Sequence, residues 1–346
     1  MSHRLPHIAI IRLSAMGDVA ITVPVILALM AQYPEVKITV VSRQFLKPIF
    51  ENIPNVKFFS AHTHREHKGL LGLFRLYRDL KSLQITEIAD LHDVLRSKVL
   101  RFLFALSGKK VAFTNKGKSE KRALTSLTNK KFQPLKTMVE RHLETFKNLG
   151  YTINLETPYF LKPVVIPTKA TEILGDKTGK WIGIAPFAHY SGKTYPIELM
   201  QKVIEELSNK EGFKILLFGG DSDFERLETL VNGKFNVYNF ARKISFKEEL
   251  KLISNLDVML SMDSGNAHLA ALFGVKTITL WGATHPYAGF APYNQPSENC
   301  LVSDREQYPL LPTSVYGNKK VAGYEDAMRT IPVERIVSRV LSQLQD

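Results

Sequence analysis

The sequence HIAIIRLSAMGDV, residues 7–19, decides the fold class of this chain. An apolar run of strand length, residues 7–13, is followed by a turn at residues 14–18 and then by the apolar start of a helix. A strand, a glycine turn and a helix in this order are typical of open α/β sheets, which bind ligands at the carboxyl ends of their strands. The sequence therefore predicts an α/β fold in which Ser14, Gly17 and Asp18 face a ligand.

The same alternation extends along the chain in two series. In the first, we expect strands at residues 7–13, 37–42, 56–59 and 87–91, and helices at 19–32, 70–82 and 94–106. In the second, we expect strands at 181–185, 214–218, 257–261 and 276–281, separated by helices at 197–209, 223–231, 246–254 and 266–273. Strands that alternate with helices form parallel sheets. The sequence predicts two Rossmann-like domains with mainly parallel sheets that face a central cleft.

Length and composition place the domain boundaries. A chain of 346 residues is long enough for two hydrophobic cores. Residues 158–179 carry three prolines and two glycines between the two series. We predict an N-terminal domain at residues 1–160, a C-terminal domain at 161–331, and a C-terminal helix at 332–346 that packs back on the N-terminal domain.

The net charge of +13 predicts an anionic partner, which could be nucleic acid, a phospholipid surface or a phosphorylated substrate. Residues 62–81 and 109–136 are rich in Lys, Arg and His, with apolar residues interleaved. They are either solvated insertions or a basic, partly apolar lip where a lipid-linked acceptor or a membrane docks. The sequence has no zinc-finger pattern and no RNP-like strand, which argues against a nucleic-acid-binding protein.

Cysteine usage and hydropathy predict the compartment. Cys300 is the one cysteine, so the chain cannot form an internal disulfide, and no His/Cys spacing indicates a zinc site. The first apolar run is too short for a signal peptide. The longest, residues 19–31, falls short of the roughly 18 to 20 residues that span a bilayer. We expect a cytoplasmic protein without a membrane span or a metal.

The turn after the first strand matches neither of two common nucleotide motifs. A dinucleotide fingerprint needs two more glycines than Gly17 supplies, which argues against a nicotinamide cofactor. Gly192-Lys193-Thr194 has the ending of a phosphate loop, but Phe187 stands where that motif needs glycine. Asp18 is then either a helix N-cap or a catalytic carboxylate at the mouth of the sheet.

A second group of candidate residues follows the strand expected at residues 257–261. Asp263, Ser264 and Gly265 precede a helix, and His268 lies one turn into it. The N–H groups of a helix N-terminus attract anions, and Gly265 would allow close approach, so a diphosphate could bind here. His268 either donates to a phosphate oxygen or is an ordinary buried or capping histidine.

Two more loops lie at the same predicted sheet edge. Lys193 follows the strand at 181–185 and is either a solvated lysine or a point charge on a leaving diphosphate. Gly219 and Gly220 follow the strand at 214–218. Three such loops in one half of the chain favour a nucleotide site.

Together, residues 12–19 (RLSAMGDV) and 263–271 (DSGNAHLAA) resemble the two signatures of the ADP-heptose:lipopolysaccharide heptosyltransferases, glycosyltransferase family nine. Residues 280–286 (LWGATHP) and 139–150 resemble further segments of the same family. The resemblance implies a GT-B fold with an acceptor-binding N-terminal domain and a nucleotide-sugar-binding C-terminal domain. It also implies a glycosyltransferase that inverts the transferred sugar and uses no metal or other cofactor.

The resemblance assigns roles residue by residue. Asp18 would be the general base, and Lys193 with the Ser264 and Gly265 amides would stabilise the leaving diphosphate. The donor-binding residues would be Ala188, His189, Gly219, Asp263, Ser264, Gly265 and His268, and the acceptor-binding residues would be Ser14, Met16, Gly17, His92 and Arg96. The chain departs from the family's commonest residues at Ser264, at Ala188 and His189, and at His92 with Asp93.

The resemblance also implies partners and a place of action. The donor would be an ADP-linked heptose and the acceptor an anionic lipid-linked saccharide of the lipopolysaccharide core. The protein would be a monomer in peripheral contact with the cytoplasmic face of the inner membrane. The alternatives are a nucleotide-sugar epimerase on the same fold, which would convert the free donor without an acceptor, and the nucleic-acid-binding protein considered above.

Overall fold

The computed structural model describes residues 5–345, which form two compact units. The first unit contains the chain up to Gly117 together with Thr137–Leu161. The second contains Lys118–Lys136 and the chain from Lys162 onward. Each unit has its own parallel sheet.

The sheet of the first unit has five parallel strands in the order β3-β2-β1-β4-β5. They are β1 (His7–Ile11), β2 (Lys37–Ser42), β3 (Val56–Ser60), β4 (Glu87–Asp90) and β5 (Lys110–Phe113). The central strand β1 is buried along its whole length, and its Ile10 lies opposite Val40 on one side and Ala89 on the other. The strand order reverses between β1 and β4, and open sheets bind their ligands at such a switch point.

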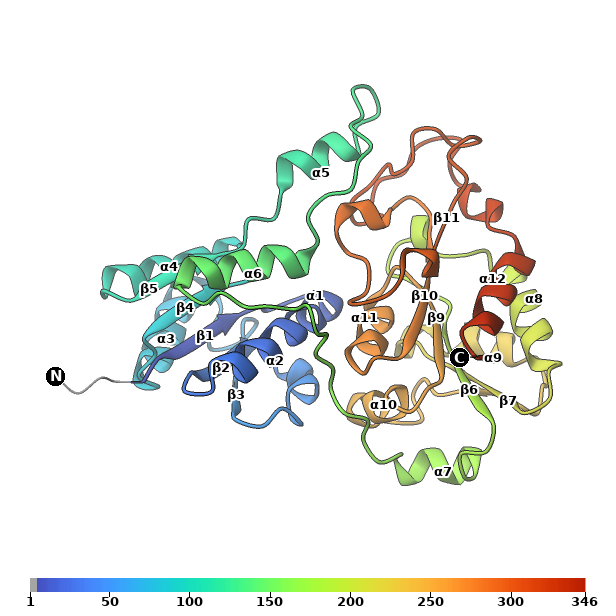
Figure 1. Ribbon diagram of the computed structural model, residues 1–346, viewed down its shortest axis with the longest axis horizontal. Helices are drawn as coiled ribbons and strands as arrows, with labels where there is room; N and C mark the ends of the chain where they lie inside the picture. The colour runs from blue at the N-terminus through green and yellow to red at the C-terminus, as the bar shows by residue number, and fades with distance from the viewer. Residues whose placement is uncertain (1–4, 346) are drawn as a thin grey trace. The chain divides into compact units, whose positions relative to one another are not determined.

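Helices cover both faces of this sheet (Figure 1). They are α1 (Met16–Ala20), α2 (Thr22–Gln32), α3 (Gly69–Ser82), α4 (Leu95–Leu106) and α6 (Met138–Leu149), with a 3-10 turn η1 (Gln44–Ile49). Ala9 and Ile11 of β1 share a hydrophobic core with Leu76 of α3 and Phe104 of α4. Because side chains alternate along a strand, Ile8 and Ile10 point to the opposite face. The helices α2 and α6 contact each other, as do α3 and α4.

The sheet of the second unit has six parallel strands in the order β11-β10-β9-β6-β7-β8. They are β6 (Lys180–Ala185), β7 (Phe213–Leu217), β8 (Val237–Asn239), β9 (Val258–Met262), β10 (Lys276–Trp281) and β11 (Cys300–Val302). Here the order reverses between β6 and β9. The loops after these two strands therefore occupy the switch point of the second sheet.

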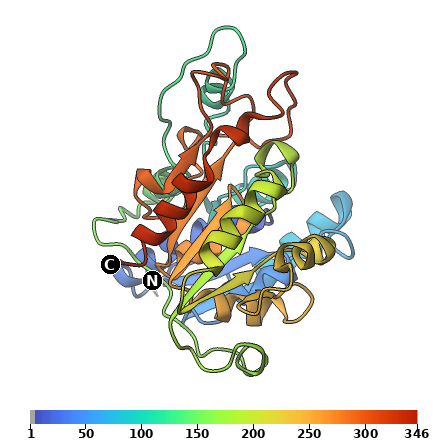
Figure 2. The ribbon, with the colours of Figure 1, turned by 90° about the vertical axis from the view of Figure 1, so that its right-hand side faces the viewer.

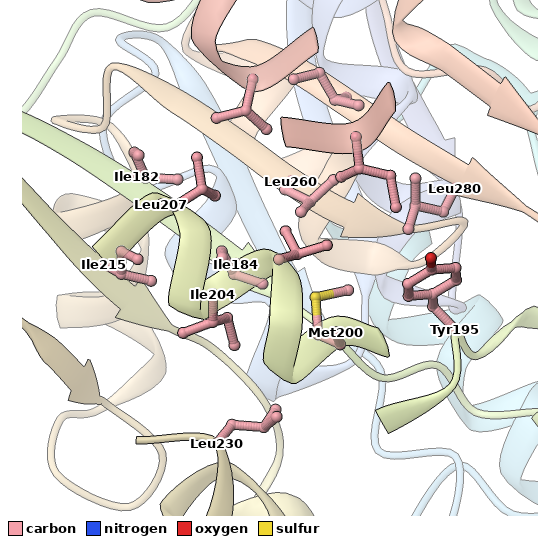
Figure 3. Packing of buried hydrophobic residues seen from close by; sticks show 14 of the residues in the cluster. Ile182, Ile184, Tyr195, Met200, Ile204, Leu207, Ile215, Leu230, Leu260 and Leu280 are labelled. Carbon is pink, nitrogen blue, oxygen red and sulfur yellow. The ribbon is translucent and has the colours of Figure 1, made fainter. Parts of the chain in front are cut away.

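The helices of the second unit are α5 (Lys118–Leu124), α7 (Thr168–Leu174), α8 (Ile197–Ser208), α9 (Phe224–Val231), α10 (Phe246–Ile253), α11 (Gly265–Leu272) and α12 (Val333–Ser342). The short 3-10 turns are η2 (Ser191–Lys193), η3 (Asp221–Asp223), η4 (Pro286–Ala288), η5 (Ser297–Asn299) and η6 (Ala327–Thr330). Figure 3 shows the core, where Ile182 and Ile184 of β6 meet Ile204 and Leu207 of α8 without exposure to solvent. Each such side chain stabilises the fold by about 1.5–3 kcal/mol.

The prediction of an α/β fold with two parallel sheets is confirmed. The prediction that the C-terminal helix returns to the N-terminal domain is wrong, because α12 packs beside α8 in the second unit (Figure 2). Its Ile336 and Val340 are fully buried in the core of that unit. The short strands β5, β8 and β11 were not predicted.

Residues 118–136 also depart from the predicted boundaries, because they fold onto the second unit. The Lys130 ammonium donates to the carbonyls of Leu124 and Pro312 at 2.8 Å each, and burial lowers its pKa to about 8. The Phe132 ring lies 4.9 Å from that of Tyr287. This part of the basic stretch at residues 109–136 is therefore packed rather than wholly solvated.

The length and hydropathy of the helices decide whether any of them could cross a membrane. No helix within residues 5–345 is both long and apolar enough to cross a membrane.

Candidate active site

Asp18 lies at the switch point of the first sheet, as the third residue of α1. Its Oδ2 accepts from the Ala15 N–H at 3.3 Å and lies 2.6 Å from the Arg12 guanidinium. The N-cap residue of α1 is Ala15, so Asp18 supports the first helical turn from within rather than as the N-cap. Its side chain keeps a quarter of its surface exposed, so a substrate can reach the carboxylate.

Arg12 fixes the loop that carries Asp18. Its guanidinium is almost fully buried and donates to the Ser14 carbonyl at 2.8 Å and to the Leu91 carbonyl at 2.6 Å, besides the ion pair with Asp18. A planar guanidinium with several fixed partners has little freedom to turn. Arg12 therefore ties together the loops after β1 and β4 and holds the Asp18 carboxylate in a fixed orientation.

His92 brings the loop after β4 to the same place. The Leu13 N–H donates to its Nδ1 at 3.4 Å, and its Nε2 lies 3.4 Å from the Ser14 hydroxyl. Burial, helped by the positive charge of Arg12, lowers the pKa of His92 to about 3, so its ring is neutral near pH 7. Since Nδ1 accepts, the proton sits on Nε2 and can be donated to Ser14.

A buried carboxylate shapes the loop that holds His92. Asp90 is fully buried, its Oδ1 accepts from the backbone N–H groups of His92 and Asp93 at 3.0 and 2.9 Å, and its Oδ2 meets Arg101 at 3.2 Å. Burial raises the pKa of Asp90, and these partners act in the opposite direction. Because Asp90 is fully enclosed, its role is to position His92 rather than to contact a substrate.

The remaining predicted acceptor residues surround this cluster less closely. Met16 and Gly17 open α1 and are half-buried beside Asp18. Arg96 lies exposed in the first turn of α4. The structure thus brings Ser14, Asp18 and His92 together around Arg12, and leaves Arg96 on the surface.

In the second unit, the loops after β6 and β9 meet through an ion pair. The Lys193 ammonium lies 3.0 Å from Asp263 Oδ2, and both side chains are mostly buried. The Thr284 hydroxyl donates to the same Oδ2 at 2.9 Å. Asp263 therefore orients Lys193, and an ammonium has three donors, so the remaining ones can bind an anion.

Gly317, from a loop distant in sequence, packs against the side chain of Lys193. Gly317 has a φ of +83°, and a Cβ at this position would collide with the aliphatic stem of Lys193. The Gly317 N–H donates to the Ser314 hydroxyl at 2.9 Å, and the Ser314 N–H donates to the Ala283 carbonyl at 3.1 Å. This loop therefore holds the lysine stem on one side, and only a residue without a side chain allows it.

The helix α11 starts beside this ion pair. Ser264 is its N-cap, but the Ser264 hydroxyl bonds to that of Ser261 at 3.0 Å and does not cap the helix. The first N–H groups of α11 are thus not satisfied by their N-cap side chain, which suits an anion. His268, one turn further, is buried.

Three predicted donor residues lie at the same sheet edge but outside the ion pair. Ala188 is half-buried against the core, and His189 is exposed with its ring 4.6 Å from that of Tyr190. Gly219 lies two residues after the end of β7 and is half-buried. Within residues 5–345, no group of three or more His, Cys, Asp or Glu side chains could hold a metal ion.

Four residues of these clusters were not among the predicted site residues, namely Arg12, Asp90, Thr284 and Gly317. Arg12 and Thr284 lie within residues 12–19 and 280–286, which resemble the family, so the resemblance could have indicated them as site residues. Nothing in the sequence indicated which residues they contact. Gly317 could be found only from its positive φ and its contact with Lys193.

Comparison with known proteins shows which family this chain belongs to. The profile of Glycosyltransferase family 9 (heptosyltransferase) matches residues 73–319. The lipooligosaccharide heptosyltransferase 2 of Haemophilus influenzae is 28% identical over 299 residues, which cover 81% of this chain and 84% of that protein.

Solved structures show the same fold. A family 9 glycosyl transferase from Veillonella parvula superposes with a TM-score of 0.76 at 19% identity, covering 100% of this chain and 99% of that one. The E. coli heptosyltransferase WaaC with ADP gives 0.69 at 19% identity, covering 97% and 99%. The GT-B fold implied by the resemblance is thereby confirmed, and the matched profile establishes that this chain is a glycosyltransferase of family 9, the heptosyltransferase family.

Proposed function

We propose that this glycosyltransferase moves a heptose from ADP-heptose to a lipid-linked saccharide of the lipopolysaccharide core, with inversion and without a metal. The observation that carries the proposal is the ion pair of Lys193 and Asp263 beside the N-terminus of α11. An ammonium and helix amides at one sheet edge suit a diphosphate. Relatives support the substrates, since one is named a lipooligosaccharide heptosyltransferase and WaaC was solved with ADP.

In the proposed reaction, Asp18 removes the proton of the acceptor hydroxyl while the hydroxyl oxygen attacks the anomeric carbon of the donor. The bond from that carbon to the diphosphate oxygen breaks, and its electron pair leaves with ADP. One displacement inverts the configuration at the anomeric carbon. The ion pair with Arg12 holds the Asp18 carboxylate in place for this proton transfer.

The leaving ADP gains negative charge as the bond breaks. Lys193, oriented by Asp263, and the amides of Ser264 and Gly265 stabilise that charge, and His268 supports the same site. These groups supply the positive charge that a metal ion supplies in other transferases. Ala188, His189 and Gly219 line the rest of the donor site, and Ser14, Met16, Gly17, His92 and Arg96 receive the acceptor.

The acceptor also sets the place of action. A lipid-linked saccharide is bound to a membrane, so we place the enzyme at the cytoplasmic face of the inner membrane, in peripheral contact and as a monomer. The lone Cys300, which cannot form an internal disulfide, fits a reducing compartment.

The test is transfer from ADP-heptose to a purified core acceptor, with product analysis. We expect Asp18→Asn and Lys193→Met each to lower kcat at least about 100-fold, the size of effect that general-base and charge-stabilising groups have. The matched control is Glu248→Gln. Like Asp18 in α1, Glu248 is the third residue of its helix, and its carboxylate accepts from the N–H of the N-cap residue. Full activity of Asp18→Asn would refute the base assignment, and conversion of ADP-heptose without acceptor would indicate an epimerase.

A further inference from the structure

The outward side of α3 and α4 exposes large apolar side chains. Leu70 and Leu71 of α3 are 77% and 90% exposed, and Leu95, Phe102 and Leu106 of α4 are 79%, 62% and 70% exposed. A single exposed apolar residue, such as Phe235, is normal for a protein surface. Five exposed apolar side chains on two neighbouring helices indicate a surface that binds another molecule or a membrane.

The two helices form one surface. The Tyr77 ring of α3 lies 4.9 Å from the Phe104 ring of α4, and the half-exposed Phe74 lies 5.9 Å from Tyr77. Both helices cover the same face of the sheet, which they meet through buried residues such as Leu76 and Phe104 (Figure 1). Their opposite sides therefore point away from the sheet together, and we call this the α3–α4 surface.

The charged residues on the α3–α4 surface are almost all cations. Within the two helices the exposed ones are Arg75, Arg78, Lys81, Arg96 and Lys98. The one acidic residue in α3 is Asp79, which is bound to His67 at 3.2 Å, and α4 has none. Asp93, just before α4, is paired with Lys98 and Arg101. The surface thus offers leucine and phenylalanine among positive charges that have little internal neutralisation.

From this combination we infer that the α3–α4 surface docks on an anionic lipid bilayer. Leucine and phenylalanine side chains enter the boundary between headgroups and acyl chains, while lysine and arginine bind lipid phosphates. The inference deepens the proposed function and rests on it in one respect, that the acceptor is lipid-linked. Because α4 starts directly after the loop of His92, the docked surface would border the acceptor side of the first unit.

The test is sedimentation of the whole protein with vesicles of equal parts phosphatidylglycerol and phosphatidylcholine, without donor or acceptor. We expect the double variant Leu71→Ser/Leu106→Ser to bind at least about tenfold more weakly. The variant Arg75→Gln/Arg78→Gln should bind more weakly and with less sensitivity to salt. The control is Val165→Ser/Phe235→Ser, which alters two residues that are 85% and 88% exposed in the second unit.

Three results would overturn the inference. They are unchanged binding by the Leu71→Ser/Leu106→Ser variant, equal binding of the wild type to pure phosphatidylcholine, and a wild-type dimer that these substitutions dissociate, which would make the surface a contact between copies. Activity on a delipidated acceptor separates this test from the proposed function. We expect the surface variants to keep that activity, whereas a wild type that binds vesicles but transfers no heptose would refute the proposed function alone.

Discussion

At the scale of single residues, the burial of His92 predicts a dependence of stability on pH. The folded pKa of His92 is about 3, below the 6.5 of an exposed histidine. Between these values the unfolded chain binds a proton that the folded chain does not, so stability falls as the pH drops through this window. At pH 5 the loss is about 2 kcal/mol, from 1.36 kcal/mol per pH unit below 6.5.

Urea unfolding of the wild type and His92→Gln between pH 7 and pH 4 measures this effect. We expect the stability of His92→Gln to fall less steeply with acidification, whatever its stability at pH 7. The control is His64→Gln, because His64 is exposed. Equal slopes for wild type and His92→Gln would show that His92 is not the group responsible.

Gly317 gives a second prediction at this scale. In Gly317→Ala the new methyl group strains a backbone with a φ of +83° and displaces the stem of Lys193. We expect a loss of about 1–2 kcal/mol of unfolding free energy from the left-handed backbone. We also expect a fall of at least about tenfold in kcat/KM, because 1.4 kcal/mol of lost charge stabilisation is tenfold in rate.

Gly323→Ala is the matched control for that variant. Gly323 has a similar φ of +79°, but no atom lies within 4 Å of the place its Cβ would take. It should lose similar stability and keep its transfer rate. Equal loss of activity in both variants would mean that backbone strain, and not the position of Lys193, sets the rate.

The candidate residues themselves were predictable to different degrees. Asp18, Lys193 and Asp263 follow strands, so the strand pattern alone placed them at sheet edges. Their partners were not predictable, because Arg12 contacts Leu91 across 79 positions and Thr284 contacts Asp263 across 21. Such contacts depend on which strands are neighbours, and local sequence does not specify strand order.

At the scale of elements, long periodic segments were predicted well and short ones were not. The strand β2 and the helices α3 and α8 lie within one residue of their expected bounds. The strands β8 and β11 have three residues each, too few for a periodic pattern. The strand β5 has four residues and lies in a lysine-rich stretch, which is not typical of a strand, so it was not predicted.

The wrong placement of α12 leads to a prediction for this element. Ile336 is fully buried against the core of the second unit, so Ile336→Ala should lower the free energy of unfolding by about 2–4 kcal/mol. Ser338→Ala, on the exposed side of the same helix, should change it by less than about 0.5 kcal/mol. Urea unfolding measures both. Equal, small effects would show that α12 contributes little to this core.

At the scale of the whole molecule, the chain passes between its two units more than once. It leaves the first unit after Gly117, returns at Thr137, and leaves again after Leu161. The first excursion packs on the second unit, where the Leu135 N–H donates to the Tyr287 carbonyl at 2.9 Å and Arg305 lies over the Phe132 ring. Sequence patterns gave a single linker, because only tertiary contacts assign residues 118–136 to the second unit.

The proposed donor site lies in the second unit and the proposed base in the first, which predicts which variants bind nucleotide. If the diphosphate binds at Lys193, ADP should stabilise the protein through its second unit alone. Added at a hundredfold excess over its Kd, a ligand raises the unfolding free energy by about 2.7 kcal/mol. We expect this increase in the wild type and in Asp18→Asn, and a much smaller one in Lys193→Met, because a lost charged hydrogen bond weakens binding by about 1.5–3 kcal/mol.

Thermal unfolding with and without ADP measures this stabilisation, and it needs no acceptor. Loss of the ADP effect in Asp18→Asn would mean that the first unit contacts the nucleotide, and an undiminished effect in Lys193→Met would remove the lysine from the donor site. The expected pattern, nucleotide binding that depends on Lys193 and transfer that depends on both residues, has one physical reason. The leaving group and the incoming hydroxyl need opposite charges beside them, and this chain carries its positive charge after β6 and its carboxylate after β1.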